Sequence, residues 1–260
     1  MDLITTLPGP LQAALATCMM YLFTMAGAAL VLTVRHGRPV LMDSMLAFGA
    51  GIMLAAAFWS LLAPAISQAQ AQGQTAWLIT ALGVAAGAAF LMLGDALVSR
   101  RMACTDSARR CRLLIASITL HNIPEGLAVG VAFGAITAAQ GAFDARSAWM
   151  LALGIAIQNF PEGASVSLPL LREGHSRRTA FRYGQRSGLV EPVAGVLGAL
   201  LAAHVRPLLP FLLAFAGGAM LLAVVAELIP ESQRSPAVHW MTAATLAGFI
   251  LMMVLDVAFG

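Results

Sequence analysis

Two short segments of the chain repeat a pattern of polar side chains that can bind a metal ion. The first is His121-Asn122-Ile123-Pro124-Glu125-Gly126, and the second is Gln158-Asn159-Phe160-Pro161-Glu162-Gly163. Residues three and four apart lie on one side of a helix, so the first two side chains of each segment project together with its glutamate. Each segment therefore predicts one half of a polar site.

The side chains of the two segments favour a divalent transition metal. Imidazole, carboxylate and amide oxygen suit Zn²⁺, Cd²⁺, Co²⁺, Fe²⁺ or Mn²⁺, whereas sodium and potassium sites seldom use histidine. Glu125 and Glu162 together neutralise one such ion, and Glu191, which precedes Pro192, is a third carboxylate that would let a second ion share them. A carboxylate at the bilayer centre costs about 3 kcal/mol, so three of them need cations or protons as partners.

The proline and the glycine of each segment have expected roles in the backbone. Pro124 and Pro161 each remove a main-chain hydrogen bond and leave the carbonyls of Leu120 and Ile157 without their usual donors. Carbonyl oxygens freed in this way can join a cation site. The glycine after each glutamate removes side-chain bulk, and we expect it to let the two motif helices approach each other closely.

Both segments lie inside stretches apolar enough to cross a bilayer. Hydrophobic residues make up 60% of the chain and charged residues 10%, and the mean hydropathy is +0.84. A soluble domain would not have this composition. Apolar runs of about 20 residues predict an all-α membrane protein with a single domain over residues 1–260 and eight spans. The spans are roughly 11–34, 44–66, 76–98, 113–136, 148–171, 180–203, 207–229 and 237–258.

The arginines predict the orientation of these spans. All basic residues of the chain are arginines, and thirteen of the fifteen lie in or beside the loops after spans one, three, five and seven. The positive-inside rule therefore predicts that these loops are cytoplasmic and that both termini face outward. The pI is about 9.1. The arginines are spread through short loops next to the membrane, where they face lipid headgroups, and this placement explains the basic pI. We therefore expect no nucleic-acid partner.

Five other reactive residues receive ordinary interpretations. Cys104 and Cys111 flank Asp106 in a predicted cytoplasmic loop, where thiols stay reduced. Free thiols are the favoured interpretation, and a regulatory metal site is the alternative. Asp95 and Asp256 lie near span ends, where we expect solvated carboxylates or carboxylates paired with arginine.

The chain resembles the ZIP family of divalent metal transporters, and in particular its bacterial branch. That branch carries His-Asn-x-Pro-Glu-Gly in span four and Gln-x-x-Pro-Glu-Gly in span five. The resemblance extends over essentially the whole chain and includes Ser187–Pro192, Gly51–Ser60 and Gly218–Glu231. It implies a ZIP-like fold of eight helices, often in a homodimer, in the bacterial cytoplasmic (inner) membrane, with no organic cofactor.

The resemblance also implies a two-metal centre. The first ion would be bound by His121, Glu125, Gln158 and Glu162, with Met53 as a thioether neighbour. The second ion would be bound by Asn122, Glu125, Asn159, Glu162 and Glu191. Some similar proteins have an aspartate where Asn159 stands, and a neutral amide would weaken the second position.

Three further residues are implied to line the transport pathway. Ser60 matches a family position on the outer entry path. Met220 and Glu227 form a seven-residue pair in span seven, and Glu227 would lie toward the cytoplasmic exit.

Together these features predict uptake of divalent metal into the cytoplasm by alternating access. The resemblance implies that spans one, four, five and six move against spans two, three, seven and eight. A metal-selective channel could use the same ligands without alternation. An intramembrane metalloenzyme is less favoured, because the chain has neither a Glu-x-x-His nor a His-Glu-x-x-His signature.

Overall fold

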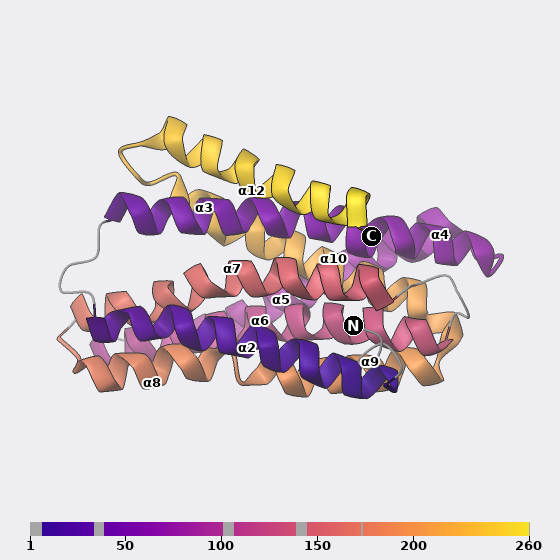
Figure 1. The fold of residues 1–260 in the computed structure, drawn as a ribbon, viewed down its shortest axis with the longest axis horizontal. Coiled ribbons are helices and arrows are strands. Elements are labelled where there is room, and N and C mark those ends of the chain that lie inside the picture. The colour runs from indigo at the N-terminus through magenta and orange to yellow at the C-terminus, as the bar shows by residue number, and fades with distance from the viewer. Residues whose placement is uncertain (1–6, 34–38, 101–106, 139–144, 173, 260) are drawn as a thin grey trace.

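A computed structural model describes residues 7–33, 39–100, 107–138, 145–172 and 174–259. These residues form eight long helical segments that run side by side along the long axis of the molecule (Figure 1). The agreement with the eight expected spans is close. The segments are α2 (Gly9–Thr33), α3–η1–α4 (Pro39–Ala56, Ala57–Leu62, Ala63–Ala71), α5 (Ala76–Arg100), α6 (Ser107–Ala138), α7 (Ala145–Arg172), α8–α9 (Arg177–Ser187, Val190–His204), α10–η3–α11 (Leu209–Ala223, Val224–Leu228, Ile229–Ser232) and α12 (Val238–Phe259).

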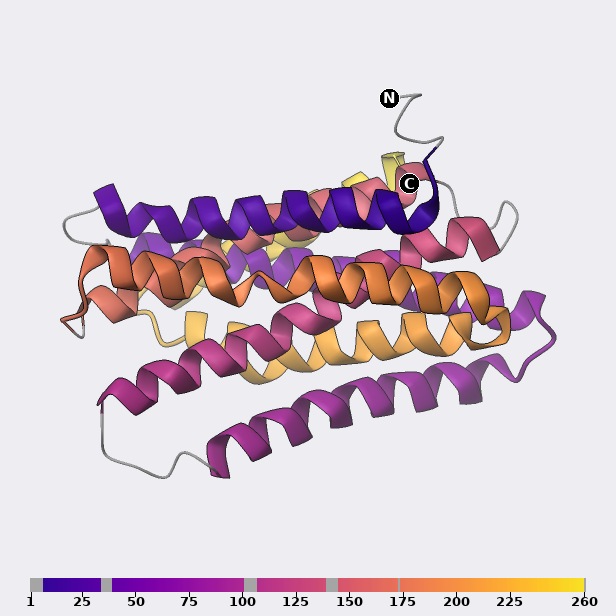
Figure 2. The ribbon, with the colours of Figure 1, turned by 90° about the horizontal axis from the view of Figure 1, so that it is seen from below.

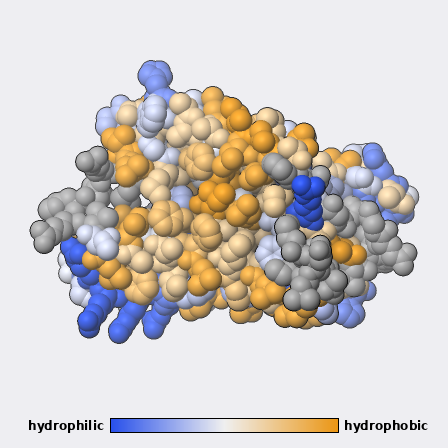
Figure 3. Space-filling view, in the orientation of Figure 1, coloured by the Kyte–Doolittle hydropathy of each residue, from blue (hydrophilic) through white to orange (hydrophobic). Residues whose placement is uncertain are grey.

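Six of these segments are long and apolar enough to cross a membrane, judged over the described residues. The other two, α6 and α7, carry the polar motifs, and those side chains lower the hydropathy of their helices. Hydrophobic residues cover the middle of the face in Figure 3, and the hydrophilic residues lie mostly toward its ends. The protein is therefore a multi-pass, all-helical membrane protein whose two most polar long helices contain the candidate site.

The helices pack in pairs that form two groups. In the first group α6 packs along α9 and α2 packs along α7, whereas in the second α3 packs along α12 and α5 along α10. Glycines permit the close approach: a Cβ on Gly130 of α6 would overlap the backbone of Gly195 on α9, and one on Gly87 of α5 would overlap that of Phe215 on α10. The groups meet where α7 contacts α3 and where α10 contacts α6. Both motif helices thus lie at the boundary between the groups.

Prolines distort two other helices more than they distort the motif helices. Helices α6 and α7 continue through Pro124 and Pro161. By contrast, π-helical turns occur at η1 and η3, just before Pro64 and Pro230. A proline lacks the N–H and crowds the carbonyl four residues earlier, so the helix widens at that point. These turns, which were not foreseen from the sequence, hold the predicted pathway residues Ser60 and Glu227.

The beginning of α2 and the end of α12 lie at the same end of the bundle, on the right in Figure 1. Helix α8 and the beginning of α12 lie at the opposite end. This arrangement is the one expected for an even number of crossings. Cys104, Asp106 and the side chain of Cys111 lie outside the described part of the chain, so their interpretation as free thiols stays a prediction.

Candidate metal centre

The two motifs meet at the side chain of Gln158. Its amide nitrogen on α7 donates to Glu125 Oε1 on α6 at 2.7 Å, to Glu162 Oε2 at 3.0 Å and to Asn159 Oδ1 at 2.9 Å. Both motif glutamates therefore turn toward one point between the helices. The structure places side chains of the two repeated segments together, as their spacing indicated.

The third carboxylate, Glu191, joins this cluster from the first turn of α9. Asn159 donates its amide nitrogen to Glu191 Oε2 at 2.9 Å, and Thr24 of α2 donates its hydroxyl to Glu191 Oε1 at 3.3 Å. Glu191 is completely buried. The contribution of Thr24 could not be found from sequence, because a threonine in an apolar span carries no signal of its partner.

The cluster combines deep burial with unpaired polar atoms. Glu125 is 1% exposed and Asn122 is fully buried. Neither polar atom of the Asn122 side chain, nor Oε2 of Glu125, has a hydrogen-bond partner among the described residues. Buried polar groups are nearly always paired, and anionic oxygens in a membrane need a positive partner. These oxygens form a donor set that suits a divalent cation.

A second group of ligand atoms surrounds the imidazole of His121. Its Nε2 lies 3.1 Å from Glu227 Oε1 and 3.9 Å from Asp95 Oδ2. One ligand atom from each of the three residues lies within 4.8 Å of the others, a spacing that could hold a metal ion. Asp95, expected to be a solvated or arginine-paired carboxylate, keeps a side chain that is 29% exposed, and α5 also brings it beside His121 of α6 and Glu227 of η3.

The interpretation of Asp256 as a solvated or arginine-paired carboxylate was wrong, because one of its oxygens is buried and the other accepts a hydrogen bond from a serine. Ser60, which is 8% exposed, donates its hydroxyl to Asp256 Oδ1 at 2.7 Å. This hydrogen bond joins η1 to the last turn of α12, toward the end of the bundle that holds the beginning of α2. Glu227 lies toward the other end, five residues before the end of α11. The Ser60–Asp256 pair and Glu227 thus lie toward opposite ends of the bundle.

The two methionines lie in apolar surroundings. Met53 of α3 and Met220 of α10 are almost completely buried, and both belong to the hydrophobic core. Methionine commonly fills such cores. Their roles as a thioether neighbour and as a pathway residue stay predictions.

The motif glycines bring each motif helix close to a different partner from the one expected. A Cβ on Gly126 would lie 2.6 Å from the carbonyl oxygen of Glu191 on α9, and one on Gly163 would overlap the carbonyl oxygen of Thr24 on α2. The expectation that these glycines let α6 and α7 approach each other was wrong. They instead seat α9 and α2 against the motif helices, which places Glu191 and Thr24 in the cluster.

Comparison with known proteins decides the family. The family model described as ZIP zinc transporter matches residues 101–256, which include both motifs. The chain belongs to the ZIP family. This family consists of transporters, so the prediction that the protein is not an enzyme is confirmed.

Several ZIP proteins are similar to this chain over most of its length. Zinc transporter ZIP11 of Homo sapiens is 38% identical over 96% of this chain and 97% of its own length. Zinc transporter GufA of Myxococcus xanthus is 38% identical over 78% of this chain and 81% of its own. Zinc transporter ZIPB of Bordetella bronchiseptica is 36% identical over 91% and 78%. The chain therefore resembles an animal ZIP11 protein as well as bacterial ZIP proteins, and the similarity to ZIP11 covers a larger share of the chain.

Proposed function

We propose that this ZIP protein transports zinc into the cytoplasm through the cluster between α6 and α7. The observation that carries the proposal is the meeting of three buried carboxylates, Glu125, Glu162 and Glu191, with the motif amides inside an apolar bundle. The similar proteins ZIP11, GufA and ZIPB are named zinc transporters. Cadmium, iron, manganese and cobalt accept the same ligand types and are expected competitors.

The proposed centre binds two ions unequally. Glu125 and Glu162 bridge the ions, His121 and Gln158 complete the first position with Met53 nearby, and Asn122, Asn159 and Glu191 complete the second. The second position is the weaker one, because its two amides carry no charge. In support, Glu191 is close enough to Asn159 to accept a hydrogen bond from it.

The proposed path crosses the boundary between the two helix groups. Zinc enters past Ser60 and Asp256, binds in the centre, and leaves past the carboxylates of Asp95 and Glu227, which lie beside the ligand His121. The centre is carried by α2, α6, α7 and α9, whereas the polar groups at the entry and the exit draw on η1, α12, α5 and η3. Movement of one helix group against the other would give alternating access within a single membrane domain, in a homodimer of the bacterial inner membrane with its termini outside.

Zinc uptake by proteoliposomes tests this function against a channel. We expect uptake by the purified protein to saturate with zinc concentration and to depend steeply on temperature, because each transport cycle requires a conformational change. Liposomes without protein are the control. Flux that rises in proportion to zinc without saturation would favour a channel, and no flux above the control would refute zinc transport.

The second metal position is tested by Asn159→Asp. The aspartate replaces a neutral amide by a charged ligand beside Glu191, so we expect the zinc content per chain to rise toward two and the affinity to increase by about tenfold or more. Metal analysis after equilibrium dialysis measures both. Asn159→Leu, which has a similar volume and no ligand oxygen, is the matched comparison and should lower the zinc content. Equal zinc content in the two variants would contradict the proposal that Asn159 is a ligand.

A further inference from the structure

Helix α8 carries three exposed arginines on one face. Arg178, Arg182 and Arg186 are spaced four residues apart and are all exposed, whereas Ala180 and Gly184 of the same helix are buried. We call these three residues the arginine stripe. Helix α8 contains no acidic residue. No ion pair joins the stripe to a carboxylate among the residues that the structure describes.

The face that bears the arginine stripe continues as an apolar face on α9. A turn at Gly188 and Leu189 links the two helices into one rod, visible in Figure 2 as the orange ribbon with a break in its middle. Leu189, Val193 and Leu197 follow Arg186 at spacings of three, four and four residues and are 47%, 59% and 53% exposed. Exposed apolar side chains on a membrane helix face the lipid acyl chains.

The length of α9 fixes the depth of the arginine stripe. The 15 residues of α9 span about 22 Å at ~1.5 Å per residue, which is less than the ~30 Å of the hydrocarbon core. Helices α8 and α9 together form one candidate span, Arg177–His204, so the last turns of α8 complete the crossing that α9 alone is too short to make. At this depth Arg182 and Arg186 extend toward the level of the lipid phosphates. Among the described residues, no carboxylate forms an ion pair with either side chain.

We propose that the arginine stripe binds the headgroup of an anionic phospholipid whose acyl chains lie along the exposed face of α9. Two observations identify this occupant: three positive charges that pair with no described carboxylate match an anionic headgroup, and the stripe is continuous with the lipid-facing surface. Phe181 and Tyr183, both partly buried on α8, are side chains of the type that gathers at the membrane interface. Figure 3 shows hydrophilic side chains projecting at the lower left, where α8 lies in Figure 1.

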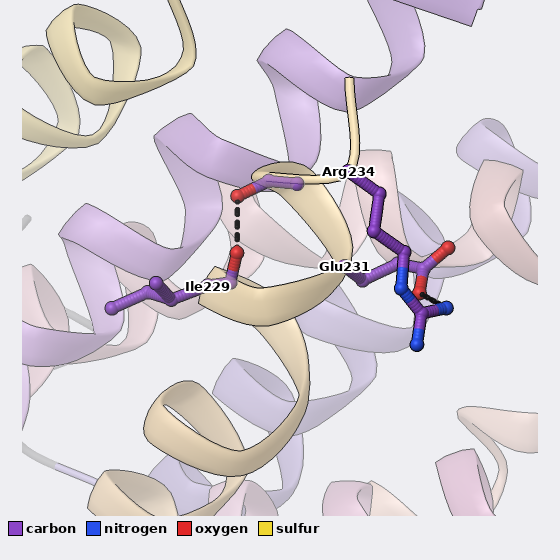
Figure 4. A network of polar contacts seen from close by, with 4 residues as sticks. Ile229, Glu231 and Arg234 are labelled. Atoms are coloured by element: carbon purple, nitrogen blue, oxygen red, sulfur yellow. Dashed lines mark hydrogen bonds and ion pairs between the residues drawn. The ribbon is translucent and has the colours of Figure 1, made fainter. Parts of the chain in front are cut away.

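Arg234 provides a matched control from the same end of the bundle. It is exposed like the arginine stripe, but its guanidinium donates to Glu231 Oε2 at 2.6 Å (Figure 4). In the same turn, Ser232 donates its hydroxyl to the carbonyl of Ile229 at 2.9 Å. The charge of Arg234 is thus already compensated by the protein. Replacing Arg234 therefore removes a positive charge that already has a carboxylate partner and leaves the arginine stripe intact.

The test compares lipids retained by the wild type, Arg178→Gln/Arg182→Gln/Arg186→Gln and Arg234→Gln. Each protein is extracted from vesicles of equal phosphatidylcholine and phosphatidylglycerol, and the retained lipids are counted by mass spectrometry. We expect the wild type and Arg234→Gln to enrich phosphatidylglycerol by about tenfold or more over phosphatidylcholine. The triple variant should lose this enrichment. Equal enrichment in the triple variant, or none in the wild type, would overturn the proposal.

A salt series on the wild type keeps the proposal testable if the triple variant fails to fold. Enrichment that depends on arginine and phosphate charges should fall as sodium chloride rises from about 0.05 M to 0.5 M, because salt screens exposed charges. The single variant Arg182→Gln should lower the enrichment by about fivefold. Enrichment that is indifferent to salt and to Arg182→Gln would also overturn the proposal.

Discussion

Zinc uptake should fall by about a hundredfold or more when Glu125 or Glu162 is replaced by alanine, because each glutamate supplies a proposed bridging ligand. The two carboxylates lie on different helices, and both accept hydrogen bonds from Gln158 Nε2. Removing either one lowers the negative charge of the centre and takes away a ligand that both proposed ions share. Initial rates of radioactive zinc uptake by proteoliposomes measure the effect.

A third variant is the control for removing a glutamate that lies outside the proposed centre. Glu231 is exposed and pairs with Arg234 at the end of α11, so Glu231→Ala should keep at least about half of the wild-type rate, as surface pairs contribute little. All three variants should elute as folded protein in detergent. If both Glu125→Ala and Glu162→Ala took up zinc at the wild-type rate, this result would contradict a role of the cluster in transport.

The second large effect is on folding and concerns Gly163. A Cβ at this position would overlap the carbonyl oxygen of Thr24 and lie 2.9 Å from the backbone nitrogen of Ala28. Backbone atoms of α2 cannot rotate away, so Gly163→Ala must push α2 and α7 apart. We expect a loss of about 3 kcal/mol or more in stability, although alanine is the better helix former by about 1 kcal/mol. Thermal unfolding in detergent measures the loss.

Gly94→Ala is the matched control for this prediction. A Cβ at Gly94 would lie 3.3 Å from a methyl group of Leu120, which can move by rotation of its side chain. This variant should unfold within about 1 kcal/mol of the wild type, because no backbone has to move. Equal stability of Gly163→Ala and Gly94→Ala would contradict the close contact between α2 and α7.

The eight helical segments could be predicted because bilayer crossing imposes a length and a composition on each span. The pairing of the two motifs was also accessible, since polar residues inside a membrane span are costly and two copies of the same costly pattern favour one shared site. Glu191 was accessible for a related reason: a carboxylate before a proline at the start of a span is costly unless it has a partner. Each of these features could be recognised from a pattern within a single span.

The features that were missed depend on contacts between distant residues. Asp95 and Asp256 were expected near solvent because they lie near span ends, yet His121 and Ser60 reach them from other helices. The partner of Gly163 was wrongly expected on α6, since a glycine shows that a helix approaches but not which one. Periodicity describes one helix at a time, so it could not show that Thr24 contacts Glu191.

Equilibrium zinc binding measures the proposed ligands of the centre without the transport cycle. The comparison is between the wild type and Glu125→Gln/Glu162→Gln, in which amides of nearly the same shape replace both carboxylates. Purified proteins are dialysed against buffered zinc, and the metal bound per chain is measured by mass spectrometry. We expect at least one zinc ion per wild-type chain, which the double variant should lose. Equal zinc content in the two proteins would contradict a metal centre between α6 and α7.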